Sequence, residues 1–366
     1  MRIVVLKERS EDEQRVALVP ESAARLIKAG AEIVVEQDAG ASAGFPDANY
    51  ITAGATVAAS TAQAVAGANA IVAVRPPQTA QIALFPERAV LVSLVPLNTP
   101  EDFLPALATR QVTALALERV PRITRAQSMD VLSSQATVAG YKAVLLGASH
   151  LPRLMPMLTT AAGSLTPAKA FIIGGGVAGL QAIATARRLG AVVSAFDVRP
   201  AVKEQVQSLG ASFVEVGVTA EGAGGYAREQ TADEQSRIQQ ALAQHIKDMD
   251  LVISTAAIPG KRAPVLITES MVAAMKPGSV IVDLAADTGG NCALTKPGET
   301  VTSANGVTIL GPLSLPGSVP LHASQMFSRN VLTLLQHLIK DGQIVIDLND
   351  EITGPMCVVH DGEVRS

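Results

Sequence analysis

The sequence contains no tryptophan and little other aromatic residue, since Phe and Tyr together make up 3% of its 366 positions. Because 48% of the residues are hydrophobic, the core must be built from Ala, Val, Leu and Ile, which favours α/β layers. An excess of positive charge is also missing, with 29 basic against 33 acidic residues and a formal net charge of −4. The cationic surface of a nucleic-acid-binding protein is therefore absent, and we expect no nucleic-acid partner.

Cysteine is nearly absent as well. Cys292 and Cys357 are too few for a disulfide framework and lack metal-ligand spacing, so we expect reduced thiols in a cytoplasmic chain. The five histidines stand alone, without a carboxylate or second histidine at ligand spacing, and we expect no metal site. The uncharged stretch 51–74 is too rich in Ala, Gly, Ser and Thr for a membrane span, and the first residues lack the apolar region of a signal peptide.

Short apolar runs alternate with helical stretches that often end in glycine, which is typical of parallel strands joined by helical crossovers. Strands are expected at 3–6, 31–36, 70–74, 89–95 and 112–116, and again at 168–173, 191–196, 211–216, 251–254 and 279–284. Long helices are expected at 130–146 and 322–339, and the chain after 343 should pack back on the first domain.

This pattern predicts an α/β fold with two Rossmann-like, doubly wound parallel-sheet domains. The first domain is discontinuous and comprises 1–133 plus 321–366, and the second comprises 134–320. We expect the two long helices to link the domains, with a cleft between them.

A glycine-rich turn follows the strand expected at 168–173. The residues Gly174-Gly175-Gly176-Val177-Ala178-Gly179 fit the dinucleotide pattern G-x-G-x-x-G, with a strand before and a helix after. We expect Gly174 to permit the turn, Gly176 to let the backbone approach a pyrophosphate, and Gly179 to let helix and strand pack closely. The N–H groups at the helix start would bind the phosphates, although a turn needed only for packing is the alternative.

Asp197 closes the next strand, 18 residues after Gly179. Its carboxylate would accept hydrogen bonds from the adenosine ribose and repel a 2′-phosphate, which favours NAD(H) over NADP(H). Arg199 argues mildly the other way, because an arginine just after this strand can pair with a 2′-phosphate.

A polar stretch lies where the first domain hands over to the second. It contains Arg119, Arg122, Arg125, Gln127, Ser128, Asp130 and Ser133. Either it faces the cleft as part of the site, or it is a solvated loop in which Ser128 or Asp130 caps the following helix. Two acids, Asp283 and Asp287, end a later strand, and either one of them faces the nicotinamide or both form turns.

The run Arg122-Ile123-Thr124-Arg125-Ala126-Gln127-Ser128-Met129-Asp130-Val131-Leu132-Ser133-Ser134 closely resembles the R-I-S-R-A-Q-S-x-D-x-L-S-S loop of the NAD(H)-binding component of proton-translocating transhydrogenase. The resemblance extends along the chain through Lys7-Glu8-Arg9, Phe196-Asp197-Val198-Arg199-Pro200, Thr255-Ala256-Ala257-Ile258-Pro259-Gly260-Lys261 and Gly289-Gly290-Asn291-Cys292.

The resemblance implies hydride transfer from NADH held by this chain to NADP⁺ held by a partner subunit, coupled to proton movement through a membrane component. It assigns the nicotinamide end to Arg122, Gln127, Asp130 and Ser133, with Gln127 bridging toward the partner's NADP(H), and a closing loop to Gly224, Gly225 and Tyr226. Its nucleotide site adds Ile123, Val177, Val198 and Ala257 to Asp197, Arg199 and the three glycines. It also implies a homodimer, peripheral on the inner membrane face through its partners.

Alanine dehydrogenase, which has the same fold, is the competing resemblance. That enzyme needs a lysine and a histidine in its first domain, and these positions are Arg75 and Pro96 here. Proline cannot transfer a proton, which disfavours this activity, although Arg15 and Asp287 remain compatible with it. A non-enzymatic NAD-binding module is the third interpretation.

Overall fold

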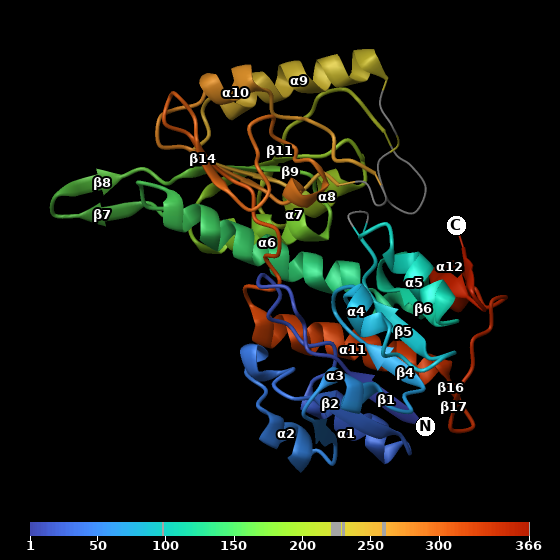
Figure 1. The fold of residues 1–366 in the computed structure, drawn as a ribbon. Helices are drawn as coiled ribbons and strands as arrows, with labels where there is room; N and C mark the ends of the chain where they lie inside the picture. The colour runs from blue at the N-terminus through green and yellow to red at the C-terminus, as the bar shows by residue number, and fades with distance from the viewer. Residues whose placement is uncertain (97–98, 221–227, 229–230, 258–260, 366) are drawn as a thin grey trace. The chain divides into compact units, whose positions relative to one another are not determined.

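The computed structural model describes residues 1–96, 99–220, 228, 231–257 and 261–365 (Figure 1). The chain divides into two compact units, one formed by Met1–Gln135 with Pro316–Ser366 and the other by Ala136–Leu315. Within the described residues, no helix combines the length and apolar composition that crossing a membrane requires.

The first unit is built on an eight-stranded sheet with the order β19-β18-β6-β5-β4-β1-β2-β3. Its strands are β1 (Arg2–Val5), β2 (Glu32–Glu36), β3 (Thr56–Ala58), β4 (Ala70–Val72), β5 (Val90–Ser93), β6 (Thr113–Ala116), β18 (Cys357–His360) and β19 (Glu363–Val364). The strands β1 to β6 run parallel in the order 3-2-1-4-5-6, so the order reverses between β1 and β4. The chain end returns as predicted, because β18 pairs with β6, but it pairs antiparallel.

Both faces of this sheet are buried, which explains why its strands are continuous apolar runs. Ile3 and Val5 of β1 point to one cluster of buried side chains, and Val4 to another on the opposite face. The first cluster also contains Phe327 and Val331 of the long helix α11. The helices of this unit are α1 (Pro20–Lys28), α2 (Asp47–Thr52), α3 (Thr61–Val65), α4 (Thr79–Ile82), α5 (Phe103–Thr109), α11 (Pro320–Leu338) and α12 (Thr353–Met356).

The second unit repeats the same strand order in a seven-stranded sheet, β11-β10-β9-β12-β13-β15-β14. Its strands are β9 (Lys169–Ile173), β10 (Val192–Phe196), β11 (Ser212–Phe213), β12 (Leu251–Ser254), β13 (Val280–Asp283), β14 (Thr300–Thr302) and β15 (Thr308–Leu310), of which only β14 is antiparallel. The order reverses between β9 and β12. In such sheets a ligand binds at the carboxyl ends of the strands beside that reversal.

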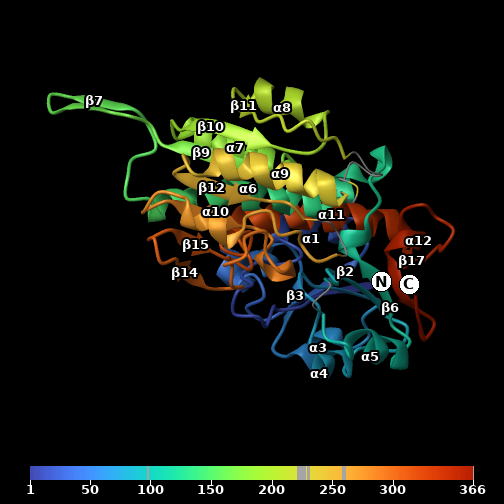
Figure 2. The same cartoon turned by 90° about the horizontal axis from the view of Figure 1, so that it is seen from above.

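Helices cover both faces of the second sheet (Figure 2). One face packs against α6 (Val131–His150), α7 (Val177–Arg188) and α8 (Val202–Ser208), and the other against α9 (Ala232–Ile246) and α10 (Glu269–Ala273). Helix α6 approaches closely through two glycines on one side: a Cβ at Gly140 would lie 2.1 Å from the Ala178 carbonyl oxygen, and one at Gly147 would lie 2.4 Å from the Leu251 side chain.

The predicted α/β fold with two Rossmann-like sheets is confirmed, and the differences are at its edges. Antiparallel strands border both sheets, whereas the sequence predicted parallel strands alone. The short strands β3, β14 and β15 were not predicted, and neither was the hairpin of β7 (Leu158–Thr160) and β8 (Gly163–Leu165), because two or three residues carry no measurable periodicity. Of the two long helices expected to link the domains, α6 carries the chain from one unit to the other, while α11 lies within the first unit.

His245 gives the second unit a pH-dependent stability. Its ring packs edge-on against Phe171, with centroids 4.6 Å apart, and its Nε2 lies 2.7 Å from Ser194 Oγ. Burial lowers the pKa of His245, and nearby Lys169 lowers it further, against the opposing charge of Asp248. The folded state therefore prefers the neutral ring, so its stabilising contribution is present above the unfolded pKa and lost as the pH falls below it.

Replacing His245 by glutamine, which cannot become charged, should flatten this dependence. We expect the melting temperature of the wild-type chain to fall between about pH 7.5 and about pH 5 by more than that of His245→Gln. Thermal unfolding at the two pH values measures the difference, and equal slopes for the two proteins would show that His245 does not contribute.

Candidate functional site

The three glycines of the turn after β9 have three different environments. Gly174 has a φ of +96°, and a Cβ there would lie 2.6 Å from Thr255 Oγ1. A Cβ at Gly179 would lie 1.8 Å from the Gly174 carbonyl oxygen, so this glycine is needed for helix and turn to pack. Gly176 has an ordinary φ of −73°, and a Cβ there would meet nothing within 4 Å. Neither the backbone conformation nor the packing of the protein therefore requires glycine at 176.

Helix α7 begins directly after Gly176, and no side chain caps its first turn. The first N–H groups of a helix have no partner within the helix, and its dipole places positive charge at this end. Since the space beside Gly176 is open, the turn offers N–H donors to an anion that can approach the backbone closely. This is the geometry that holds a pyrophosphate.

Asp197 follows β10 and lies against the same turn. Its Oδ2 accepts the N–H of Gly175 at 2.7 Å. Arg199 grips the carboxylate on its other side, with Nε 2.8 Å from Oδ1 and Nη2 2.7 Å from Oδ2. The backbone N–H of Arg199 also donates to Oδ1, at 2.8 Å. The two side chains with opposing implications for the 2′-phosphate thus form one ion pair, with exposed fractions of 6% for Asp197 and 18% for Arg199. Val198, between them, is partly buried.

The segment after β12 lies beside this turn. The hydroxyl of Thr255 donates to the carbonyl oxygen of Gly174 at 3.1 Å, and Ala257, two residues later, is exposed. Val177, the first residue of α7, is also exposed, at 40%. Gly224, Gly225 and Tyr226, expected to form a closing loop, lie outside the described residues.

The two acids after β13 form turns in the structure. Asp283 is completely buried and accepts hydrogen bonds from the N–H groups of Ala285, Asn291 and Cys292 and from the Thr295 hydroxyl. Asp287 lies in a short 3₁₀ turn, Ala286–Thr288. Of the two alternatives that the sequence left open for these acids, turn formation accounts for Asp283. Within the described residues, no group of three His, Cys, Asp or Glu side chains could hold a metal ion.

The Arg122–Ser133 loop lies in the first unit and forms a 3₁₀ turn over Thr124–Met129, followed by α6. Asp130 caps that helix, because its Oδ1 accepts the Ser133 N–H at 2.9 Å and its Oδ2 accepts the Ser133 hydroxyl at 2.6 Å. Arg122 and Gln127 are not buried, and Ile123 is exposed at its edge of the loop only in part. The loop therefore leaves the side chains of Arg122 and Gln127 accessible, whereas Asp130 and Ser133 bind each other.

Helix α11 and the chain end hold this loop from behind. Ala126 and Met129 are buried in the same cluster as α11, and Asn330 of that helix donates from Nδ2 to the Ser128 carbonyl oxygen at 2.8 Å. Arg125 lies 3.4 Å from a carboxylate oxygen of Asp350. No sequence pattern indicates these contacts, because they join residues more than two hundred positions apart.

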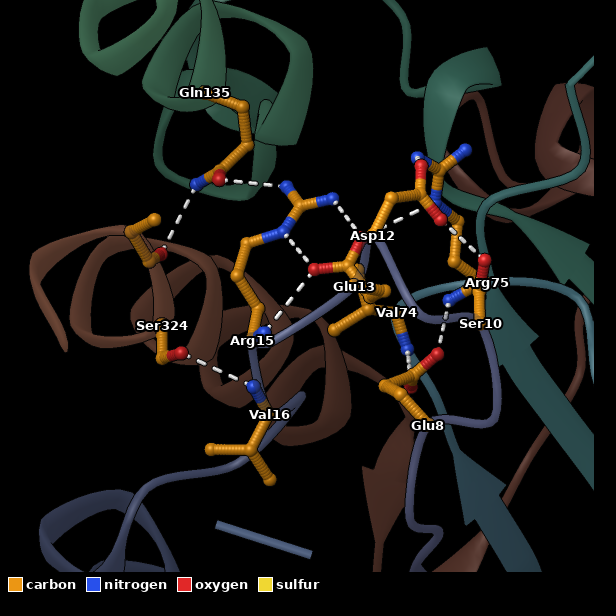
Figure 3. Close-up of polar contacts among 11 residues, drawn as sticks. Glu8, Ser10, Asp12, Glu13, Arg15, Val16, Val74, Arg75, Gln135 and Ser324 are labelled. Carbon is orange, nitrogen blue, oxygen red and sulfur yellow. Dashed lines mark hydrogen bonds and ion pairs between the residues drawn. The ribbon is translucent and has the colours of Figure 1, made fainter. Parts of the chain in front are cut away.

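Arg15 and Arg75, which bear on the competing resemblance, both bind Glu13 (Figure 3). Arg15 is 4% exposed, and its guanidinium donates to both Glu13 oxygens, at 2.7 and 2.5 Å, and to Gln135 Oε1 at 2.8 Å. Burial alone would raise the pKa of Glu13, but the hydrogen bonds and charge of Arg15, with the charge of Arg75, lower it below its usual value. Glu13 therefore stays ionised and supplies the carboxylate partner of both arginines.

Glu8, nearby in Figure 3, accepts the N–H groups of Val74 and Arg75 at 2.7 and 3.1 Å and so joins the ends of β1 and β4. Burial raises its pKa to about 8, although these hydrogen bonds oppose the rise. Its position at the reversal of strand order makes it part of the scaffold that places Arg75.

Known families match both parts of the chain. The model described as alanine dehydrogenase/PNT, N-terminal domain, matches residues 4–139, and the model described as alanine dehydrogenase/PNT, C-terminal domain, matches residues 143–366. The chain belongs to the alanine dehydrogenase/PNT family. The resemblance expected from the Arg122–Ser134 loop is thereby confirmed at the level of the family.

Within the alanine dehydrogenase/PNT family, the similarity to transhydrogenase is greater. The chain is 47% identical over 375 residues to the first of the alpha-subunit chains of NAD(P) transhydrogenase of Rhodospirillum rubrum, with 100% of this chain and 97% of that protein covered. The crystal structure of transhydrogenase from Sinorhizobium meliloti superposes with a TM-score of 0.90 at 42% identity, covering 100% of both chains. Alanine dehydrogenase of Halomonas elongata is 30% identical over 370 residues, with 100% of this chain and 94% of that protein covered.

Proposed function

We propose that this chain binds NAD(H) and donates hydride from NADH to NADP⁺ held by a partner subunit of a proton-translocating transhydrogenase. The observation that carries the proposal is the uncapped start of α7 beside Gly176, with the Asp197 carboxylate against the same turn. The whole-length similarity to proteins named NAD(P) transhydrogenase subunit alpha supports the acceptor and the partners. Such partners would place the chain at the inner face of the membrane.

The residues have a clear division of labour in this proposal. The α7 N–H groups hold the pyrophosphate, and Asp197 accepts hydrogen bonds from the adenosine ribose. A hydride carries its own electron pair, so the nicotinamide rings supply the chemistry and the protein needs no general acid or base. The task of Arg122 and Gln127 is to orient the nicotinamide and bring the two rings within about 3–3.5 Å.

Replacing Gln127 by alanine tests this assignment. Because the side chain is exposed, its loss should leave the fold intact, and hydride transfer from NADH to an NADP⁺ analogue should slow about tenfold through poorer alignment. The assay contains the NADP(H)-binding partner subunit, without which no transfer is expected. Gln63→Ala, an exposed glutamine on α3 of the same unit, is the matched control. Equal rates for the two variants would contradict a role for Gln127.

The alanine dehydrogenase alternative is disfavoured by the Glu13 cluster as well as by Arg75 and Pro96. A substrate carboxylate would have to displace Glu13 from Arg15, whose guanidinium is buried and already binds Glu13 and Gln135. Alanine-dependent NADH production by the isolated chain would overturn the transhydrogenase proposal. Nucleotide binding without transfer in either assay would instead favour a non-enzymatic NAD-binding module.

The hairpin of β7 and β8 supports a homodimer. It projects from the second unit (Figures 1 and 2), and all residues of both strands are exposed. Leu158 and Leu165 pair across it with exposed fractions of 41% and 54%, next to Met157 at 68%. An isolated two-stranded hairpin is marginally stable in water, so we propose that the same surface of a second copy covers it.

Charged residues at the hairpin should separate the copies. We expect the double variant Leu158→Asp/Leu165→Asp to sediment as a monomer at concentrations where the wild-type chain is a dimer, while NADH binding is retained. Val364→Asp, which places the same charge on an exposed valine of β19 in the other unit, should remain dimeric. Sedimentation velocity measures both, and a double variant that stays dimeric would place the interface elsewhere.

A further inference from the structure

Asn291 is a completely buried amide whose side chain makes four hydrogen bonds. Its Oδ1 accepts from Ser254 Oγ at 2.7 Å and from the Ala256 N–H at 3.1 Å. Its Nδ2 donates to the carbonyl oxygens of Ala256 at 2.8 Å and Pro264 at 2.9 Å. Every donor and acceptor position of the amide is therefore occupied, and rotating the amide by half a turn would break all of these bonds.

The partners of Asn291 flank a single segment of chain. Strand β12 ends at Ser254, and Ala256 and Pro264 lie at the start and end of the segment that follows it. The amide ties these two ends together. The same segment begins against the glycine turn, because Thr255 donates to the Gly174 carbonyl oxygen. Asn291 thus sets the path of the chain as it leaves the carboxyl end of β12.

Asp283 in turn fixes Asn291. The backbone N–H of Asn291 donates to Asp283 Oδ2 at 2.7 Å, and the carboxylate also binds Cys292 N–H and the Thr295 hydroxyl. A buried carboxylate is tolerated only when its oxygens are satisfied in this way. The amide is therefore held from the β13 side and projects its four bonds toward the β12 side.

We propose that Asn291 is a positioning residue for the nicotinamide half of NAD(H). In sheets with this strand order, the two mononucleotide halves of the ligand lie on opposite sides of the reversal between β9 and β12. Asp197 after β10 marks the adenosine side, so the segment after β12, which contains Ala257, borders the nicotinamide side. This inference rests on the proposed NAD(H) site and extends it to a residue that does not touch the ligand.

The experiment compares NADH with ADP, which lacks the nicotinamide half, on the full chain by calorimetry. Asn291→Asp keeps the shape and the Oδ1 acceptor but turns the donor into an oxygen that repels the Ala256 and Pro264 carbonyls. We expect the Kd for NADH to rise about tenfold and the Kd for ADP to change less than about twofold. Ser254→Ala, which leaves both bonds to the segment intact, is the matched control and should change the NADH Kd less.

The outcomes separate the inference from the proposed function. Equal weakening of NADH and ADP would mean that Asn291 supports the fold in general, and an unchanged NADH Kd would mean that it supports neither; each overturns the inference. If Asn291→Asp does not fold, Asn291→Ser removes the same donors without a charge and is judged by the same ratio. A wild-type chain that fails to bind NADH contradicts the proposed function itself.

Discussion

Replacing Gly176 by alanine should weaken NADH binding about a hundredfold without destabilising the protein. A Cβ at this position meets nothing within 4 Å, and the φ of −73° suits any residue, so the folded chain has no reason of its own for glycine here. A pyrophosphate seated on the α7 N–H groups would meet the added methyl directly. Overpacking of this kind costs about 1–3 kcal/mol, and each 1.4 kcal/mol is a tenfold change in Kd.

Gly179→Ala is the matched comparison three residues along. Its Cβ would lie 1.8 Å from the Gly174 carbonyl oxygen, so the helix must move away from the turn and the free energy of unfolding should fall by about 1–3 kcal/mol. We therefore expect Gly176→Ala to melt like the wild-type chain and to lose affinity, and Gly179→Ala to melt earlier. Calorimetric Kd values and melting temperatures test both. If Gly176→Ala binds NADH normally, the pyrophosphate does not lie on this turn.

The central strands were predictable because burial on both faces produces a continuous apolar run. Strand β9, Lys169–Ile173, is the clearest case, since four of its five residues are buried. Strand β14 has no buried residue, and the strands of the β7–β8 hairpin are wholly exposed, so hydrophobic patterning had nothing to detect. The edges of a sheet are therefore where reading the sequence fails.

The site divides along similar lines. The Gly174 turn and Asp197 could be located from spacing, because a turn and the end of the next strand lie within one βαβ unit. The contacts of Arg15 with Gln135 and of Asn291 with Ser254 join residues 120 and 37 positions apart, and no local pattern encodes them. The structure also resolved a conflict that the sequence could only state, by pairing Arg199 with Asp197.

Replacing Asp197 by asparagine should turn this ion pair into a test of coenzyme choice. In the wild-type chain the carboxylate repels a 2′-phosphate and also holds the guanidinium of Arg199 through two hydrogen bonds. Asparagine removes the charge and offers Arg199 at most one acceptor, while an oxygen remains for the Gly175 N–H. Arg199 can then pair with the 2′-phosphate of NADPH.

We expect the ratio of the Kd for NADPH to the Kd for NADH to fall about a hundredfold in Asp197→Asn. Hydrogen bonds to charged groups contribute about 1.5–3 kcal/mol, and NADPH gains such bonds while the ribose of NADH loses its charged acceptor. The double variant Asp197→Asn/Arg199→Ala separates the two causes. It should keep the weaker NADH binding and lose the gain for NADPH. If Asp197→Asn rejects NADPH as firmly as the wild-type chain, neither the charge nor the ion pair selects the coenzyme; if the double variant keeps the gain, charge repulsion alone accounts for the preference and Arg199 is a bystander.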